Sequence, residues 1–593
     1  MKKLIYSLAS TLLVLTLLFS FSCKKEVVET KTVTVTQTVT SVPPTQSEVP
    51  ETTEKPAVTN WWDKFGKPVY GGEIIFAPAR FHISMDAYSQ TDYGASLYFL
   101  EPLWIPDWKV DRKVWPFAGP FIPQEYLKGQ LAESWEIIDS QTMVVKIRQG
   151  IHWQNKEPVN GREFTAYDVE FHYDRFLGTG SGFTEPSKVQ ISRMGVIEKV
   201  TAQDKYTVIF KFKKPSALNF AEPMEQDGRN CIEAPEVIKQ FGDATNWRNA
   251  VGTGPWILTD YVESTSFTFQ KNPNYWGYDE RHPENKLPYA DSFKVLYISD
   301  VSTRIAALRT GKVHFADEIG FQQAKTLTGS NPELNQAQLP FINTNGLFVR
   351  LDQSPFNDIN VRKAMQMAID RKALAEGYYG GIIESTPCGA IHPSFKGYAY
   401  TYDEWPNALK DEYSYNPAKA RELLATAGYP KGFTTTVLVS TADDLAVLEA
   451  VKSYFNEIGI ILNIGARDPV TTNSLAASRK YETFWNRNTG SVALPFQIVT
   501  MYQSKHSQNF SMASDPNFDK ICDELLSVIN IDDVKPLVHQ LDKYIIEQHW
   551  GIRLFPINTF NIWQPYLKGY SGESLLRMGN PGGWLWARLW LEK

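Results

Sequence analysis

The sequence has little that would hold a metal ion or support covalent catalysis. Its 593 residues include four cysteines and nine histidines, with no Cys-x-x-Cys and no His-Glu-x-x-His pair. The ligand spacing typical of zinc and redox sites is therefore missing, and we expect no metal and no cofactor. The segment Gly178–Gly182 lacks the Lys-Ser/Thr of a phosphate-binding loop, so we expect a surface loop there.

An excess of charge of either sign is also missing. The chain has 60 Lys and Arg against 66 Asp and Glu, which gives a formal net charge of −6. Such a balance does not indicate binding to nucleic acid or to an acidic membrane surface. We therefore predict no nucleic-acid partner.

Long hydrophobic runs are scarce. The one at the N-terminus, Leu12–Phe21, follows Lys2 and Lys3 and is about half of the ~20 residues that a membrane-spanning helix needs. This pattern predicts an export signal over residues 1–22, with a transmembrane anchor as the weaker alternative.

The residues after this run suit lipoprotein processing. Ser22 precedes Cys23, although Ser20 stands where such sites usually carry Leu. We predict that Cys23 is lipidated and that residues 23–60, rich in Thr and Pro, form a disordered tether. The expected location is outside the cytoplasmic membrane, in the periplasm or on the cell surface, held by the lipid anchor only.

Aromatic residues, by contrast, are abundant. They make up 13% of the chain, with 17 Trp and 28 Tyr. Most are expected in hydrophobic cores, and the surplus fits a large groove that contacts a ligand through ring faces.

The stretch Val251–Trp276 has the most distinctive pattern. Gly252, Gly254 and the proline that follows predict a tight bend with an unusual backbone torsion. The alternating runs Trp256–Val262 and Ser266–Gln270 predict a β-hairpin. A second turn then presents a tyrosine and a tryptophan as an aromatic pair.

Together with other blocks, this stretch resembles the family 5 solute-binding proteins of ABC importers, which take peptides, nickel or oligosaccharides. The blocks occur in family order between about residues 69 and 570. They are Leu131–Trp135, Met143–Gly150, Gly161–Val169, Val251–Trp276, Ser354–Ala364 with Ala368–Arg371, and Tyr415–Leu424 with Ala427–Pro430.

The resemblance implies an α/β fold of two lobes, the periplasmic-binding-protein fold of type II, cluster C, with an extra N-terminal subdomain. Hinges are expected near 318–320 and 553–556. The expected boundaries are 61–103, 216–319 and 556–593 for lobe I, 104–215 for the extra subdomain, and 320–555 for lobe II.

Local patterns agree with an α/β chain. A helix over Asp300–Gly311, with Asp300 as its cap and Gly311 at its end, lies between strands Phe293–Ile298 and Lys312–Asp317. This order predicts a βαβ unit and a parallel sheet. In the predicted lobe II, Asn416 is a helix cap, and Ile460–Ile464 is a strand.

The resemblance also implies a function, capture of a solute and its delivery to an ABC permease without catalysis. The solute is an oligopeptide or an oligosaccharide, and the alternative is a secreted carbohydrate-active hydrolase. Dipeptide binders of the family hold the amino group with an Asp in a Trp-x-x-Asp stretch. Here that stretch is Trp485, Asn486, Arg487 and Asn488, and the position for a carboxylate-binding Arg, Ser440–Asp444, contains none.

A short peptide held by its ends is therefore disfavoured, because buried charged termini without partners cost several kcal/mol each. An oligosaccharide stacked on tryptophan and a longer peptide held along its backbone both remain. Trp485 as an ordinary core residue is the alternative to its role in binding. The other predicted ligand contacts are Phe81, His82, Phe341 and Asn343.

The remaining cysteines leave two possibilities. The resemblance makes a disulfide between Cys231 and Cys388 conceivable in an exported protein. The alternative is that Cys231, Cys388 and Cys522 are buried or free thiols.

Overall fold

The computed structural model describes residues 60–89, 94–117, 121–225, 228–441, 443, 445–486, 494–574 and 582–592. The chain divides into two units, Met1–Val58 and Thr59–Lys593. The predicted signal peptide, Cys23 and nearly all of the tether lie outside the described residues.

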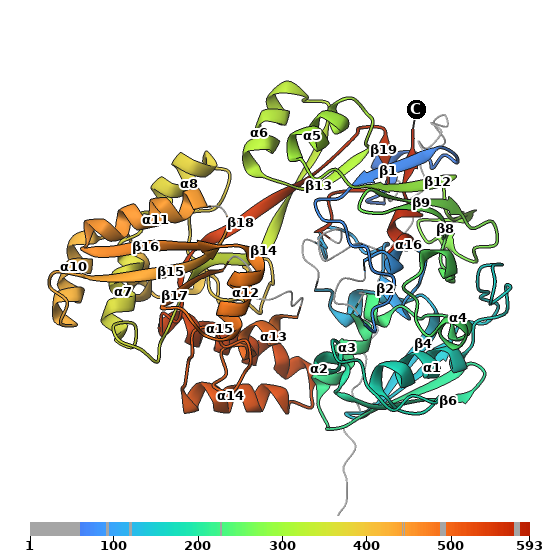
Figure 1. The fold of residues 1–593 in the computed structure, drawn as a ribbon, viewed down its shortest axis with the longest axis horizontal. Helices are drawn as coiled ribbons and strands as arrows, with labels where there is room; N and C mark the ends of the chain where they lie inside the picture. Colours follow the sequence, from blue (N-terminus) through green and yellow to red (C-terminus); the bar gives the residue numbers. More distant parts are fainter. Residues whose placement is uncertain are drawn as a thin grey trace, which may run out of the picture. The chain divides into compact units, whose positions relative to one another are not determined.

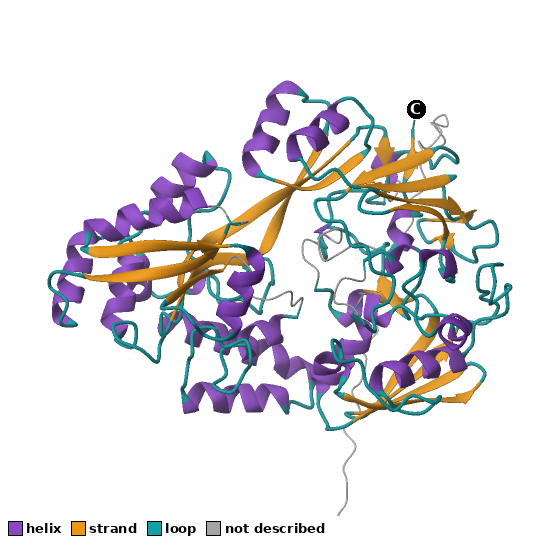
Figure 2. Ribbon diagram, in the orientation of Figure 1, coloured by secondary structure: helices purple, strands orange, loops and turns teal. Residues whose placement is uncertain are grey.

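A ten-stranded mixed sheet runs through the second unit (Figures 1 and 2). Its strand order is β16 (Ile460–Arg467), β15 (Phe433–Ser440), β17 (Thr483–Asn486), β14 (Asn335–Val349), β18 (Ile552–Trp563), β13 (Phe315–Ile319), β1 (Glu73–Ala77), β12 (Ser292–Leu296), β9 (Ser266–Lys271) and β8 (Trp256–Val262).

The sheet contains two strand groups, and each includes three neighbouring strands that are parallel. In the first strand group, β13, β1, β12, β9 and β8, the strand β1 is parallel to both β12 and β13. In the second strand group, β17, β15 and β16, the strand β15 is parallel to both neighbours. The long antiparallel pair β14–β18 connects the two groups (Figure 1).

A separate four-stranded antiparallel sheet lies within the predicted extra subdomain. Its order is β4 (Ala132–Asp139), β5 (Thr142–Ile147), β7 (Thr207–Phe212) and β6 (Ile197–Asp204). Three small sheets complete the strands: β2 (Trp104–Pro106) with β3 (Leu127–Gly129), β10 (Tyr278–Asp279) with β11 (His282–Lys286), and β19 (Leu567–Lys568) with β20 (Trp590–Leu591).

Helices surround these sheets (Figure 2). They are α1 (Ala166–Leu177), α2 (Ile191–Met194), α3 (Ala221–Met224), α4 (Pro235–Phe241), α5 (Val301–Arg309), α6 (Phe321–Ser330), α7 (Ile359–Met367), α8 (Arg371–Tyr379), α9 (Asn407–Tyr413), α10 (Pro417–Thr426), α11 (Leu445–Glu457), α12 (Pro469–Ala477), α13 (Pro495–Thr500), α14 (Pro516–Leu526), α15 (Val534–Glu547) and α16 (Gly583–Trp586). Within the described ranges, none of them is long and apolar enough to span a membrane.

Several local predictions are confirmed. Asp300 caps α5 by accepting a hydrogen bond from the backbone N–H of Thr303, and β12, α5 and β13 form the predicted βαβ unit. Asn416 caps α10 in the same way. β8 and β9 form the predicted hairpin.

The reason given for Gly252 and Gly254 was wrong. Neither has a positive φ; what their positions require is space. A Cβ atom on Gly252 would lie 1.8 Å from the carbonyl oxygen of Phe99, and one on Gly254 would lie 2.7 Å from it. The bend therefore packs backbone against backbone, a contact that any larger residue would prevent.

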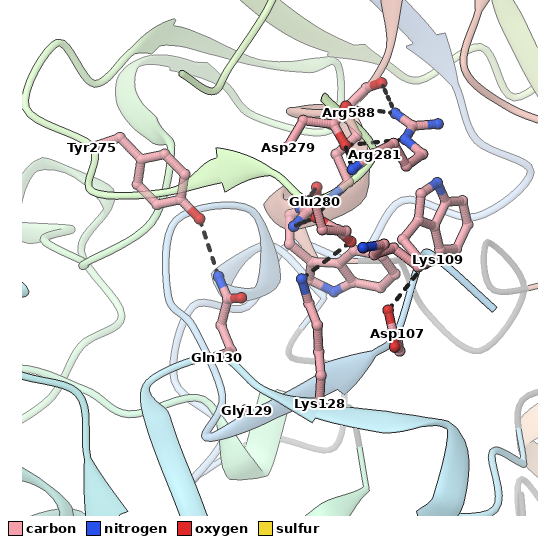
Figure 3. A network of polar contacts seen from close by, with 12 residues as sticks. Asp107, Lys109, Lys128, Gly129, Gln130, Tyr275, Asp279, Glu280, Arg281 and Arg588 are labelled. Carbon is pink, nitrogen blue, oxygen red and sulfur yellow. Dashed lines mark hydrogen bonds and ion pairs between the residues drawn. The ribbon is translucent and has the colours of Figure 1, made fainter. Parts of the chain in front are cut away.

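The end of the Val251–Trp276 stretch also has a structural role. The Tyr275 hydroxyl donates a 2.8 Å hydrogen bond to Glu101, and the amide of Gln130 contacts both groups. The indole N–H of Trp276 donates to the other carboxylate oxygen of Glu101. These hydrogen bonds connect the end of the Val251–Trp276 stretch to residues next to β2 and β3 (Figure 3).

Next to this contact lies a buried network of charges (Figure 3). Glu280 accepts hydrogen bonds of 2.8 and 3.0 Å from Arg588, and Lys128 lies 3.1 Å from its other oxygen. Burial alone would raise the pKa of Glu280, but Arg588 and Lys128 together lower it to about 2.

The conceivable disulfide is not formed. Cys231, Cys388 and Cys522 are buried thiols in the described part of the chain. This outcome agrees with the alternative that the sequence left open.

Candidate functional site

The carboxyl ends of the two strand groups point toward each other along β14. Strand β13 runs parallel to β14 and ends at Ile319, opposite Phe560, which pairs with Gln338. Strand β17 runs the other way and ends at Asn486, opposite Gly346. From Gln338 to Gly346 the connecting strand is about 26 Å long. Because ligands of open α/β sheets bind beyond the carboxyl ends of the strands, we take these two facing edges as the candidate site.

Aromatic side chains lie at the edge of the first strand group. Phe81 belongs to the segment after β1, and Tyr297 directly follows β12. Their rings are stacked, with centroids 5.3 Å apart and planes at 15°. Phe267 also packs against Phe81, with the ring centroids 4.9 Å apart. The half-buried Phe81 is thus held in place by its neighbours, as a residue that positions a ligand requires.

Two acidic residues stand at the same edge, at the end of β13. Asp317 is buried, accepts a hydrogen bond from the backbone N–H of Ala79, and lies 3.4 Å from Arg304. Burial, followed by repulsion from Glu318, raises the pKa of Asp317 well above its ordinary range. Glu318 has a positive φ of 44° and lies 3.7 Å from the exposed Arg80. This strained backbone at a strand end is typical of functional positions.

The edge of the second strand group carries an arginine. Arg467 is the last residue of β16 and pairs with Ser440, the last residue of β15. Its side chain is exposed, and its guanidinium donates a 2.7 Å hydrogen bond to the carbonyl oxygen of Ala466. The guanidinium therefore has donors left for a carboxylate.

The predicted contact Trp485 lies in a hydrophobic core. It pairs with Leu347 in the sheet, belongs to the core cluster that includes Val437 and Leu347, and is 1% exposed. The ring thus has a packing role in this structure, as the alternative stated, and its role as a ligand contact stays a prediction.

The other predicted contacts are described to different extents. Asn486 ends β17, and Phe341 and Asn343 belong to β14, where the pairing with β18 shifts between Phe341 and Thr344. Their backbones therefore lie at or between the facing edges. His82 follows Phe81 and is half-buried. Arg487 and Asn488 lie outside the described residues.

Sequence reasoning missed Arg467, Asp317 and Glu318. The strand beginning at Ile460 was expected to end at Ile464, three residues before Arg467, and Asp317 was taken as the end of a strand beside a hinge. The available signal was the topology, since a residue that ends a parallel strand lies at the ligand edge.

Two cavities lie apart from the predicted contacts. Both have walls from segment 192–225 and from α13, and their volumes are about 420 Å³ and 410 Å³. None of the eight residues predicted from the sequence lines either cavity among the residues described. The ligand edge is therefore assigned from strand topology.

The described residues include no group of three or more His, Cys, Asp and Glu side chains that is arranged to hold a metal ion.

Two strand groups, a two-strand connection and facing polar edges define the class of a two-lobed binding protein. Solved structures share this fold. DppA from Helicobacter pylori in complex with the peptide STSA has a TM-score of 0.67 and 21% identity over 88% of this chain and 99% of its own. HbpA2 from Haemophilus parasuis has a TM-score of 0.71 and 18% identity over 88% of this chain and 100% of its own.

Residues 127–510 match the family described as bacterial extracellular solute-binding proteins, family 5. The chain belongs to this family. The glutathione-binding proteins GsiB of Shigella flexneri and Escherichia coli K12 are each 31% identical to it over 348 residues, 58% of this chain. The match covers 61% of each relative, less than two thirds of its length.

Proposed function

We propose that this protein captures a short peptide outside the cytoplasmic membrane and delivers it to the permease of an ABC importer. The observation that carries this proposal is the pair of facing strand edges, with acidic groups on one and an arginine on the other. The relatives named above support it, because one binds glutathione and one was solved with a tetrapeptide.

The charges suit a ligand with an amino end and a carboxylate end. At one edge lie the carboxylates of Glu318, 3.7 Å from Arg80, and of the buried Asp317, 3.4 Å from Arg304. At the other edge lies the guanidinium of Arg467. A peptide amino group can take the place of Arg80 beside Glu318, and a peptide carboxylate can bind Arg467, whereas a neutral sugar pairs with neither. Peptide ends are therefore held by residues other than those of the Trp485–Asn488 stretch.

A peptide is favoured over an oligosaccharide on a second ground. Stacking of sugar on Trp485 requires an accessible ring face, and this ring is 1% exposed. We also propose that the peptide is released unchanged, since the family consists of binding proteins, and the hydrolase alternative has no support.

The predicted lipid anchor on Cys23 and the tether over 23–60 complete the proposal. They would keep the folded body near the permease without orienting it. Mass spectrometry of the native protein tests this, with a lipidated Cys23 as the expected mature N-terminus and an unmodified Cys23 as the contrary result.

The proposed contacts of the peptide remain Phe81, His82, Phe341, Asn343 and the Asn486–Asn488 segment. The lobe boundaries given above are also a proposal. The pairing of β14 with β18 favours an outgoing crossing at about 341–346, later than 318–320, and a return near 553–556.

A thermal-shift screen tests the function. It compares di- to pentapeptides and glutathione with cello-, xylo- and manno-oligosaccharides. A specific ligand at 100 times its dissociation constant should stabilise the protein by about 2.7 kcal/mol. We expect this from a peptide, and stabilisation by oligosaccharides alone would refute the proposal.

A further inference from the structure

An arginine lies beside the acidic end of β13. The guanidinium of Arg80 is 3.7 Å from the carboxylate of Glu318. The Arg80 side chain is 57% exposed, whereas that of Glu318 is only 15% exposed. The carboxylate is therefore largely enclosed by the protein, and the cation beside it reaches in from the solvent.

The neighbours of Arg80 in the chain fix its backbone at this place. On one side, the backbone N–H of Ala79 donates a 2.6 Å hydrogen bond to the buried carboxylate of Asp317. On the other side, the ring of Phe81 packs against two aromatic rings, at centroid distances of 5.3 and 4.9 Å. Because both flanking residues are anchored, the position of Arg80 next to Glu318 is a feature of the fold.

The backbone of Glu318 is fixed as well. Its φ is 44°, and its N–H donates a 3.4 Å hydrogen bond to the side-chain oxygen of Asn561 in β18. A left-handed backbone is unfavourable for a residue with a Cβ atom, so the surrounding structure must hold Glu318 in place. Separation of the ion pair therefore requires only that the exposed Arg80 side chain rotates.

The contact between the two charges is loose. Its N–O distance of 3.7 Å exceeds the length of about 2.7–2.9 Å of a charge-assisted hydrogen bond. Ion pairs with an exposed partner contribute little to stability, because water and salt screen them. An ammonium group at hydrogen-bond distance from Glu318 would interact with it more strongly than Arg80 does.

We propose that Arg80 is a movable counter-ion of Glu318 and sets how strictly the site requires a free amino end. A peptide amino group takes the place of Arg80 at the carboxylate. Where an uncharged part of a peptide covers this edge, Arg80 stays, so that the carboxylate is not buried without a cation. This inference rests on the proposed function and adds to it a residue that determines specificity.

The test uses the full chain and the best binder among the di- to pentapeptides of the thermal-shift screen, with a free and with an N-acetylated amino end. Titration calorimetry gives the dissociation constant of each form. The free form should bind Arg80→Gln about two- to fivefold more tightly than wild type, because its amino group no longer displaces a cation. The acetylated form should bind the variant more weakly, because it covers Glu318 without a counter-ion. The preference for the free form should therefore rise about fivefold or more.

Two further variants serve as controls. Glu318→Gln removes the charge for which both cations compete, so Arg80→Gln in this background should no longer alter the preference. Arg309→Gln is the matched loss of an exposed arginine. Arg309 is the last residue of α5, which follows the carboxyl end of β12 and leads to the start of β13, so it lies at the opposite edge of the strand group. Its loss should leave the preference unchanged.

The outcomes separate the two proposals. A preference that Arg80→Gln leaves unchanged or lowers would overturn this inference and leave the proposed function intact. A rise that persists in the Glu318→Gln background, or that Arg309→Gln also produces, would overturn it as well, because Arg80 would then not act through Glu318. If no peptide of the screen binds, the proposed function fails, and the inference fails with it.

Discussion

The backbone N–H of Ala217 donates a 2.7 Å hydrogen bond to the carbonyl oxygen of Val528. Ala217 is the first residue of a 3₁₀ helix, Ala217–Phe220, and Val528 follows α14. The next residue, Leu218, packs in the cluster that contains Leu525. This hydrogen bond is a direct backbone contact between the segment before α3 and the segment after α14.

Loss of this hydrogen bond should speed the release of a peptide. Ala217→Pro removes the donor, and proline is tolerated at the first helical position after the extended Ser216 (φ −165°, ψ 138°). A net hydrogen bond is worth about 0.5–1.5 kcal/mol, so the dissociation rate should rise roughly two- to tenfold. Stopped-flow measurement of peptide release checks this.

The control is Val301→Pro, which also places proline at a first helical position after an extended residue. It should leave the dissociation rate unchanged. An unchanged rate in Ala217→Pro would show that this hydrogen bond does not help to retain the peptide.

Gly252→Ala should destabilise the protein by at least about 2 kcal/mol, because the added Cβ would lie 1.8 Å from the Phe99 carbonyl oxygen. Urea unfolding provides the measurement. Gly329→Ala in α6 is the matched control, since nothing lies within 4 Å of its added Cβ. That change should be neutral or stabilising, as expected for alanine in a helix. Equal stabilities of the two variants would contradict the close approach seen here.

Features of the fold that depend on residues close together in the sequence are predicted better than features that depend on distant residues. Helix caps such as Asp300 and Asn416 depend on neighbours three residues away, and both were predicted correctly. The role of Gly252 was not, because Phe99 lies far away in the sequence. Glycine patterns indicate that space or torsion is needed but do not say which.

The site was less predictable for a similar reason. Phe81 lies at the first edge, and its role as a ligand contact stays a prediction. Arg467 was not predicted, because the apolar alternation of its strand ends before it. Trp485 illustrates the risk of the opposite error, in which a core residue is predicted to contact the ligand. The sequence alone does not distinguish an aromatic residue that packs in a core from one that contacts a ligand.

The free energy of unfolding of Glu280→Gln should depend less on pH than that of the wild type. The pKa of Glu280 is about 2 in the folded protein and about 4.3 in an unfolded chain. The ionised Glu280 side chain therefore contributes its full stabilisation above about pH 4.3, and this contribution is lost as the pH falls toward 2. At pH 7 the variant leaves the buried Arg588 without its partner and should lose about 3–5 kcal/mol.

The difference between wild type and Glu280→Gln should therefore narrow between pH 5 and pH 3 in urea unfolding experiments. Glu263→Gln, at an exposed position, should show no difference at any of these pH values. A Glu280→Gln difference that stays constant with pH would contradict the ion-pair network of Figure 3.

Arg467→Gln should weaken binding of peptides with a free carboxylate by about tenfold, the scale of a charge-assisted hydrogen bond. C-terminally amidated peptides should bind wild type and variant equally. Arg421→Gln, an exposed change in α10, should affect neither. If Arg467→Gln weakens both kinds of peptide to the same degree, Arg467 does not bind the carboxylate.

Titration calorimetry of the purified protein is the sharpest test of whether its ligand is a peptide. The titrants are the peptide that stabilises the protein most in the thermal-shift screen and the best oligosaccharide of that screen. We expect saturable one-to-one binding of the peptide, its recovery chemically unchanged, and no saturable heat from the oligosaccharide. One-to-one binding of the oligosaccharide with no peptide binding would show that the protein is not a peptide-binding protein.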